Sequence, residues 1–294
     1  MTATSMVGIV GLGQMGGAIA TRLLSVGYEV YGYDLEPQRV AALQLKGLKS
    51  AGSAEEVAKR CKTVLLLLPT PAAVTDLLAE DRPFHGQLGP GHAVVDMGTT
   101  GFDATQVAAR SVDATGARFL DCALGKTDAE AVRGELRLLV GAADDHNLSK
   151  DLHGVFQALG TSVFFCGGVG LGQAAKVISN MLANAITIAD AEALALGKRC
   201  GLDRDVLISV LMATGAANGQ LEGVLKRKVL AGDITPGFRI SLALKDQRLA
   251  LSLAQSLASE ASLAESVEQR LSQAVEAAAG ELDISAMVRE VGGT

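Results

Sequence analysis

The pair Lys176 and Asn180 carries the clearest chemical potential in the chain. The two residues stand four positions apart in an apolar stretch that predicts a helix over residues 173–197. Residues four apart on a helix are rotated by roughly 40° from each other, so the two side chains share one face. A lysine whose pKa is lowered by burial can take up or release a proton, and a neighbouring amide can orient the reacting oxygen. On residue types alone, a solvated lysine and a backbone-bonding asparagine remain the alternative.

A glycine motif near the N-terminus predicts a phosphate-binding turn. It follows a predicted strand over residues 7–10 and precedes a predicted helix over residues 15–26. In such a motif the first glycine permits a tight turn, the second lets the backbone approach a pyrophosphate, and the third lets the helix lie close to the strand. Asp34 ends the next predicted strand, over residues 29–33, where a carboxylate can accept both ribose hydroxyls of an adenosine. The predicted dinucleotide site therefore comprises Gly11, Leu12, Gly13, Gln14, Met15, Gly16 and Asp34.

Asp34 also favours one form of the cofactor. Its carboxylate would repel the 2′-phosphate of NADP, and no arginine directly follows it. NAD is therefore the predicted cofactor, with NADP as the alternative. Arg39, one turn into the next predicted helix, is the residue that could reverse this preference. The simpler interpretation of Arg39 is a solvated charge on that helix.

The composition excludes several other classes of function. The chain has 294 residues with 26 basic and 32 acidic side chains, so its net charge is −6. An acidic chain with 3% aromatic residues and no tryptophan is a poor candidate for binding nucleic acid. The four cysteines are too far apart in sequence for a zinc site or a disulfide framework, so we expect no metal. We recognise no signal peptide or membrane-spanning stretch and expect a soluble cytoplasmic protein with no membrane partner.

The order of the apolar patterns predicts two domains. Up to about residue 165, short β-branched runs alternate with amphipathic stretches, which predicts βαβ units and a mostly parallel sheet. From Gln173 onward the spacing is helical. The predicted fold is an α/β Rossmann-type domain over residues 1–166, joined through the long helix to an all-α domain over residues 167–294. Further predicted strands are 64–68, 93–97, 118–121, 137–140 and 162–165; further predicted helices are 37–45, 54–60, 72–80, 104–114, 143–158, 205–212, 217–229, 240–259 and 264–279.

Five motifs, in order along nearly the whole chain, resemble those of the β-hydroxyacid dehydrogenases, the group that includes 3-hydroxyisobutyrate dehydrogenase. They are the glycine motif, Leu68-Pro69, Asp96-Met97-Gly98-Thr99, Gly170-x-Gly172-xxx-Lys176-xxx-Asn180, and Phe238 with Lys245-Asp246. The resemblance implies a Rossmann domain, an all-α domain and an active site between them, in a homodimer or homotetramer. It also implies that Lys176 and Asn180 are catalytic. The residues it places around the nicotinamide are Leu68, Pro69, Thr99 and Lys245.

The segment expected to hold the substrate departs from the family's pattern. Where the family usually has Asp-Ala-Pro-Val-Ser-Gly-Gly, this chain has Asp121-Cys122-Ala123-Leu124-Gly125-Lys126-Thr127, so a cation replaces a glycine. A basic residue followed by threonine resembles the sulfolactaldehyde reductases, whose Gly-Arg-Thr holds a sulfonate. However, lysine lacks the planar fork of arginine, and Ser179 and Ala183 stand where that subgroup has Asn and Ser. We therefore expect a small anionic substrate, carboxylate or sulfonate, bound by Gly125, Lys126, Thr127 and Ser179.

Together these observations predict an NAD-dependent oxidoreductase that interconverts a primary alcohol and an aldehyde on a 3-hydroxyisobutyrate-like 3-hydroxy acid, with proton transfer by Lys176. A sulfolactaldehyde reductase acting on a three-carbon sulfonate is the first alternative. A dinucleotide-binding protein without catalysis is the second. An imine reductase shares the architecture, but the resemblance places Asp or Tyr where Lys176 stands.

Overall fold

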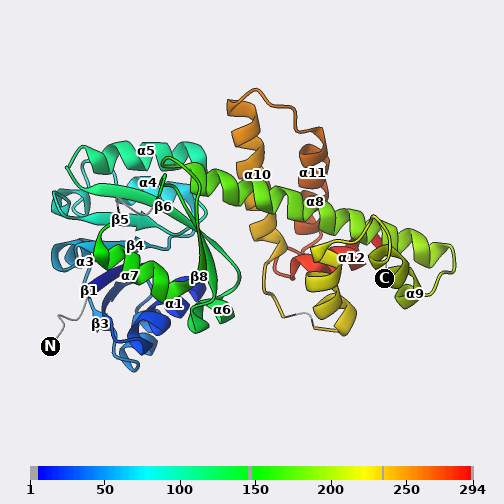
Figure 1. Ribbon diagram of the computed structural model, residues 1–294, viewed down its shortest axis with the longest axis horizontal. Coiled ribbons are helices and arrows are strands. Elements are labelled where there is room, and N and C mark those ends of the chain that lie inside the picture. The colour runs from blue at the N-terminus through cyan, green and yellow to red at the C-terminus, as the bar shows by residue number, and fades with distance from the viewer. Residues whose placement is uncertain (1–5, 145–147, 234, 293–294) are drawn as a thin grey trace. The chain divides into compact units, whose positions relative to one another are not determined.

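An eight-stranded sheet organises the first part of the chain in the computed structural model, which describes residues 6–144, 148–233 and 235–292. The strand order is β3-β2-β1-β4-β5-β6-β7-β8 (Figure 1). Neighbouring strands run parallel except for the antiparallel pair β6 and β7. The mostly parallel sheet predicted from the sequence is therefore confirmed. The strands are β1 (Met6–Val10), β2 (Glu29–Tyr33), β3 (Lys49–Ser50), β4 (Thr63–Leu66), β5 (Ala93–Asp96), β6 (Arg118–Gly125), β7 (Leu136–Val140) and β8 (Gly160–Phe165).

Helices cover both faces of this sheet, because successive residues of a buried strand point to opposite sides. In β1, Val7 and Ile9 belong to one apolar cluster and Val10 belongs to the other. The α/β fold class predicted for this region is confirmed. The first face is covered by α1 (Gln14–Ser25), α2 (Pro37–Gln44), α6 (Asp128–Arg133) and α7 (Lys150–Leu159), and the second by α3 (Ala54–Arg60), α4 (Pro71–Leu77) and α5 (Phe102–Asp113).

Internal contacts divide the chain into two compact units, residues 1–176 and 177–294. The long helix α8 (Leu171–Arg199) begins in the first unit and ends in the second. Lys176 is thus the last residue of the first unit, and Asn180, one turn later, belongs to the second. The domain boundary between residues 166 and 167 lies just before this helix and stays a prediction.

Several elements of the first unit differ from the sequence-based expectation, among them β3 and η1 (His85–Gln87), which were not predicted. The strand predicted over 118–121 continues to Gly125, because its last four residues pair with β7. The helix predicted over 143–158 starts later, at Lys150, where the Ser149 side chain accepts a hydrogen bond from the Leu152 N–H; residues 145–147 of that prediction lie outside the described residues. The short helix α6 was not predicted, since only one of its six residues, Ala131, is buried and it shows no apolar period.

The second unit is built from helices. Among its described residues the extended pairing is a single bridge between Arg239 and Asp283. The helix predicted over 217–229 is interrupted: it consists of a π-helical turn and a separate 3₁₀ turn. No helix of the described chain is long and apolar enough to cross a membrane. After α8 come α9 (Arg204–Met212), η2 (Gln220–Leu225), η3 (Val229–Ala231), α10 (Ile240–Ser256), α11 (Ser262–Glu276), η4 (Ile284–Ala286) and α12 (Met287–Gly292).

A buried carboxylate, Asp190, lies in the middle of α8. Its Oδ1 accepts a hydrogen bond from Asn218 Nδ2 at 2.9 Å, whereas Oδ2 has no hydrogen-bond partner among the described residues. Burial raises the pKa of Asp190 above its ordinary value, and the hydrogen bond from Asn218 only partly offsets this. A carboxyl group whose pKa is higher in the folded chain than in the unfolded chain destabilises the fold as the pH rises through that interval.

We expect Asp190→Asn to melt a few degrees above the wild type at pH 8, because the amide removes a buried charge and can still accept the hydrogen bond from Asn218. The difference in Tm should shrink as the pH falls toward 4, where Asp190 becomes protonated in the wild type. Thermal unfolding followed by circular dichroism between pH 4 and pH 8 measures it. A difference that does not change with pH would contradict the assignment of a buried charge.

Candidate functional site

The three glycines of the N-terminal motif have different surroundings. Gly11 has φ +94°, and a Cβ there would collide with the carbonyl oxygen of Leu67. A Cβ on Gly16 would likewise collide with the carbonyl oxygen of Gly11. At Gly13, by contrast, the nearest atom to an added Cβ is Nη1 of Arg39, 3.9 Å away. The backbone at Gly13 is therefore open to a ligand, as the pyrophosphate of a dinucleotide requires, while the other two positions are closed by the fold.

Asp34 follows β2 and is held rigidly beside this turn. Its Oδ2 accepts the N–H of Leu12 at 2.6 Å, and its Oδ1 accepts the N–H of Glu36 at 2.8 Å. Arg39 lies 3.3 Å from Oδ1 and 3.0 Å from the Glu36 carboxylate, so it forms an ion pair rather than standing alone as a solvated charge. The carboxylate predicted to meet the ribose is thus fixed in place, and the neighbouring arginine is engaged with acidic groups.

The loops that follow β1, β4 and β5 lie together at the carboxyl edge of the sheet. A Cβ added to Gly11 would lie 3.4 Å from Cδ2 of Leu68. A Cβ added to Gly98 would lie 3.1 Å from the carbonyl oxygen of the same leucine. Pro69 and Thr99 follow directly on these loops. The strand order reverses between β1 and β4, and open α/β sheets bind ligands at such a switch point. The residues predicted to hold the cofactor from Gly11 to Gly16, Leu68 and Thr99 are therefore brought to one edge.

Two of the predicted cofactor residues turn inward. The Leu12 side chain is buried in the core, and Met15 packs against the same apolar cluster. Gln14 faces outward, where its Nε2 donates to Asp128 Oδ2 at 3.0 Å. This contact links the first turn of α1 to the first turn of α6, so the glycine turn lies beside the segment predicted to bind the substrate.

That segment contains a residue in an unusual backbone conformation. Lys126, exposed at the end of β6, has φ +85°, a region that favours glycine. Thr127 caps α6: its N–H and its hydroxyl both donate to Glu130, and the hydroxyl bond lowers the pKa of the Glu130 carboxyl. The amide and hydroxyl protons of Thr127 are therefore both directed to Glu130, whereas the Lys126 ammonium belongs to a residue with a strained backbone.

The second unit holds a polar cluster around Asn180. Its Nδ2 donates to Asp246 Oδ2 at 2.6 Å, and Lys245 Nζ lies 3.2 Å from Asp246 Oδ1. Asp246 is buried, on α10, and was not assigned a role from the sequence; only its neighbour Lys245 was. Ser179 is exposed on α8. Lys176 belongs to the other unit, so the joint site predicted for Lys176, Asn180 and Lys245 stays a prediction.

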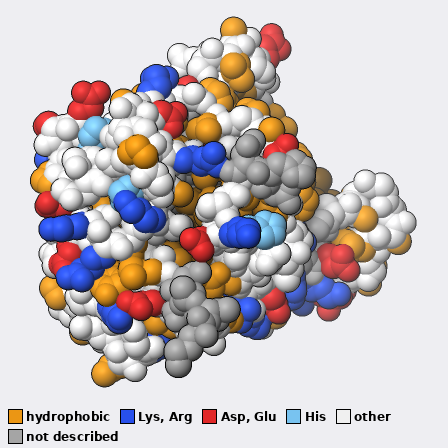
Figure 2. Space-filling model, turned by 60° about the vertical axis from the view of Figure 1, so that its left-hand side comes forward, with side chains coloured by type: hydrophobic (Ala, Val, Ile, Leu, Met, Phe, Trp, Pro, Cys, Tyr) orange, Lys and Arg blue, Asp and Glu red, His pale blue; other side chains and the backbone are white. Residues whose placement is uncertain are grey.

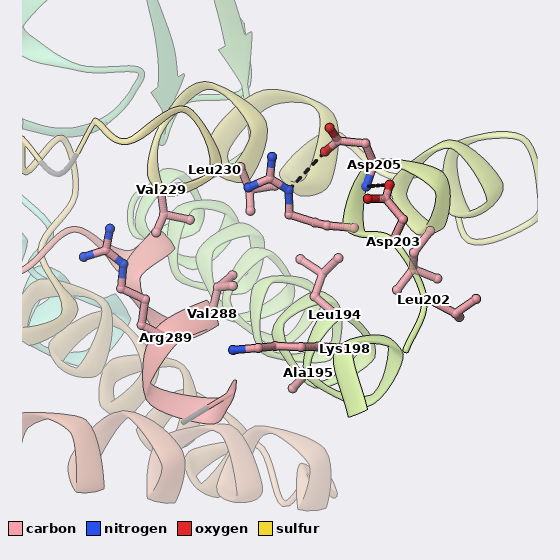
Figure 3. Close-up of a pocket in the computed structure, with 12 residues that line it drawn as sticks. Leu194, Ala195, Lys198, Leu202, Asp203, Asp205, Val229, Leu230, Val288 and Arg289 are labelled. Carbon is pink, nitrogen blue, oxygen red and sulfur yellow. Dashed lines mark hydrogen bonds and ion pairs between the residues drawn. The ribbon is translucent and has the colours of Figure 1, made fainter. Parts of the chain in front are cut away.

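A cavity of about 580 Å³ lies elsewhere in the second unit (Figure 3). Its walls come from α8, α9, η3 and α12, and none of the predicted site residues lines it. On the face of the molecule shown in Figure 2, the described Lys and Arg side chains are interspersed with Asp and Glu. Among the described residues, no group of three His, Cys, Asp or Glu side chains could hold a metal ion. Neither the cavity nor the charged surface competes with the glycine turn as a candidate site.

Comparison with known proteins gives matches over almost the whole chain. Residues 6–168 match the NAD binding domain of 6-phosphogluconate dehydrogenase, and residues 170–291 match the family described as NAD-binding of NADP-dependent 3-hydroxyisobutyrate dehydrogenase. The chain is 30% identical over 285 residues to 3-sulfolactaldehyde reductase of Escherichia coli (strain K12), covering 97% of this chain and 95% of that protein. The chain belongs to the 3-hydroxyisobutyrate dehydrogenase family.

Two further members of the family are similar at comparable levels. NAD-dependent L-serine dehydrogenase of Pseudomonas aeruginosa is 31% identical over 259 residues, covering 86% of each chain. The solved structure of Mycobacterium tuberculosis 3-hydroxyisobutyrate dehydrogenase with L-serine aligns with a TM-score of 0.88 at 25% identity, covering 98% of this chain and 99% of that one. Membership makes the protein an NAD(P)-dependent hydroxyacid dehydrogenase or reductase and confirms the predicted family, fold class and type of cofactor. The relatives differ in their named substrates, so the substrate is not decided by membership.

Because the glycines differ in their surroundings, Gly13→Ala and Gly16→Ala should fail in different ways. Gly13→Ala meets open space at φ −60°, so it should keep the wild-type Tm but lose affinity for NAD by about tenfold or more, since a methyl group blocks the pyrophosphate. Gly16→Ala should lower the Tm, because its methyl group collides with a backbone oxygen. Thermal melts and NAD titrations of both variants test this. Equal losses of stability in the two would contradict it.

Proposed function

We propose that this member of the family interconverts a primary alcohol and an aldehyde on a small anionic 3-hydroxy acid, with NAD as the hydride carrier. The observation that carries the proposal is the Lys176–Asn180 pair on α8, in which Asn180 is fixed by the buried carboxylate of Asp246. A bare binding protein would have no need for an amine and an anchored amide one helical turn apart. An amine beside an anchored amide suits a proton acceptor and the group that orients it, next to a bound hydride acceptor.

A nicotinamide bound at the carboxyl edge of the sheet supplies the hydride chemistry. We assign its dinucleotide to the turn from Gly11 to Gly16 and to Asp34, and its nicotinamide to Leu68, Pro69, Thr99 and Lys245. In the oxidation direction, the substrate hydroxyl gives its proton to the neutral amine of Lys176, and the carbon that bears this hydroxyl loses its hydride. In the reduction direction, the Lys176 ammonium returns that proton to the carbonyl oxygen. The two directions use one residue in its two protonation states.

Asn180 orients the reacting oxygen in this proposal. Its Nδ2 is engaged with Asp246, which determines which end of the amide points away from α10. The second N–H of Nδ2 then remains to donate to the reacting oxygen, and the amide oxygen remains to accept a hydrogen bond from the Lys176 nitrogen. An asparagine without this anchor could flip and present either end.

We assign the anionic group of the substrate to Gly125, Lys126 and Thr127, with Ser179 on α8 as a further contact. Support for Lys126 is its backbone: a lysine held at φ +85° costs about 1–2 kcal/mol relative to a relaxed conformation. Such strain is commonly retained where a side chain serves a ligand. A sulfonate is the second candidate for the anion, favoured by the cation at this position and by the similarity to 3-sulfolactaldehyde reductase.

The experiment that tests the function is a turnover screen with NAD and NADP against 3-hydroxyisobutyrate, D-glycerate, L-serine and 2,3-dihydroxypropanesulfonate. With the best substrate, Lys176→Ala should lower kcat by about 10³-fold or more while NAD affinity stays within about threefold. Lys198→Ala, on the same helix but outside the assigned site, is the matched control and should keep wild-type kcat. Parallel loss of NAD binding in Lys176→Ala, or no turnover of any substrate by the wild type, would overturn the proposal.

The strained backbone gives Lys126→Gly two opposite expected effects. Glycine relieves about 1–2 kcal/mol of strain but adds about 0.5–1 kcal/mol of unfolded-state entropy, so the variant should be more stable by up to about 1.5 kcal/mol. Loss of the ammonium should raise KM for the anionic substrate by about tenfold. Urea unfolding and steady-state kinetics measure the two effects. A variant that is more stable with unchanged KM would show that Lys126 does not touch the substrate.

We further propose a homodimer or homotetramer that works in the cytoplasm. The helix α9 has no buried residue, and Val206 and Val210 on it are each more than half exposed. A second copy of the chain would cover this apolar helix. Sedimentation equilibrium tests the assembly, and a monomer at micromolar concentration would contradict it.

A further inference from the structure

We propose that Gln173 is a positioning residue that holds the loop carrying Thr99 against the first turn of the helix carrying Lys176; the proposal rests on the function proposed above. Gln173 is fully buried, in the first turn of α8. Its Oε1 accepts the N–H groups of Thr100 at 3.0 Å and Gly101 at 3.3 Å, and its Nε2 donates to the carbonyl oxygen of Gly98 at 2.9 Å. One side chain therefore binds the backbone on both sides of Thr99.

The chemistry of these three bonds requires a glutamine. The loop presents two N–H donors and one carbonyl acceptor, and an amide side chain accepts the former with its oxygen and donates to the latter with its nitrogen at any pH. Glutamate would keep the two accepted bonds but could not donate to Gly98 in its ionised form. Methionine has a similar length and would leave all three backbone groups without this partner, which is costly for the buried N–H groups of Thr100 and Gly101.

The backbone of Gln173 is itself anchored to β6. The Asp121 carboxylate accepts the N–H of Gly170 at 2.6 Å and the N–H of Gln173 at 2.8 Å. Burial raises the pKa of Asp121 in spite of these hydrogen bonds. A Cβ on Gly172 would collide with the carbonyl oxygen of Leu139 on β7, so this first turn also lies directly against the sheet. Residue 173 thus connects β6, the 98–101 loop and α8.

This connection decides where Lys176 lies relative to Thr99. Lys176 follows Gln173 by three residues, so the two side chains are neighbours on the helix. All the residues that make the connection belong to the first unit. If the loop were released from Gln173, Thr99 and the nicotinamide assigned to it could shift relative to Lys176, and a misplacement of about 1 Å can cost about 10²-fold in rate.

Gln173→Met is the main test, with Gln106→Met as its matched control. Gln106 Nε2 donates to the Val169 carbonyl oxygen, so this hydrogen bond is to the chain just before the same helix and not to the 98–101 loop. We expect Gln173→Met to lower kcat by about 10–100-fold, with NAD affinity within about threefold of the wild type. In the enzyme without ligands, hydrogen exchange at the Thr100 and Gly101 amides should become faster. Gln106→Met should show neither change.

Gln173→Glu keeps both accepted hydrogen bonds and tests separately whether residue 173 lies close enough to Lys176 to act on it. Its carboxylate, three residues before Lys176, stabilises the ammonium form, so the midpoint of the pH profile for alcohol oxidation should move to higher pH. Wild-type kcat in folded Gln173→Met would overturn the proposal. So would losses of kcat, NAD affinity and Tm that Gln106→Met reproduces, or an unshifted pH profile in Gln173→Glu.

Failure of the proposed function would look different. In that case Lys176→Ala would lose NAD affinity together with turnover, or the wild type would turn over none of the four substrates. Faster exchange at Thr100 and Gly101 in Gln173→Met would then still support positioning of the loop. Unchanged exchange at these two amides would overturn it independently of any activity.

Discussion

The arrangement of the first unit depends on one buried carboxylate, Asp121. A helix begins with N–H groups that have no partner within it, and here the first turn of α8 donates to Asp121 at the end of the parallel part of the sheet. Water cannot replace this acceptor, because Asp121 is completely buried. The longest helix of the chain therefore starts at a point determined by the sheet, and the amine on its second turn has a defined distance from the strand that leads to Lys126.

The geometry of the N-terminal glycine turn could be predicted because its information is local. The turn, the helix start and Asp34 fall within one βαβ unit, and each glycine has a separate geometric reason for its place. The strands and helices of the sheet followed from apolar runs bounded by turns. The end of β6 could not be predicted, because residues 122–125 of this strand are extended only through their pairing with β7.

The supporting residues of the site could not be predicted in the same way. Gln173 binds backbone 72 to 75 positions away, and Asn180 meets Asp246 across 66 positions. In sequence each is a polar residue in a helix, and polar residues in helices are common. The Lys245-Asp246 dipeptide was noticed through resemblance, but which of the two touches Asn180 became clear only from the fold. The only available sign of such a supporting residue was a polar side chain inside an apolar helical face. This sign marks Gln173 and Asp190 equally, so it does not tell which of them supports the site.

The continuity of α8 restricts how this protein can change in length. One inserted residue in a helix turns everything after it by about 100°. An insertion between Gln173 and Lys176 would turn the amine away from the side chain that binds the 98–101 loop, and one between Lys176 and Asn180 would turn the anchored amide away from the amine. Insertions and deletions should therefore be absent from the first three turns of α8 in functional variants, even where substitutions at its exposed positions are tolerated.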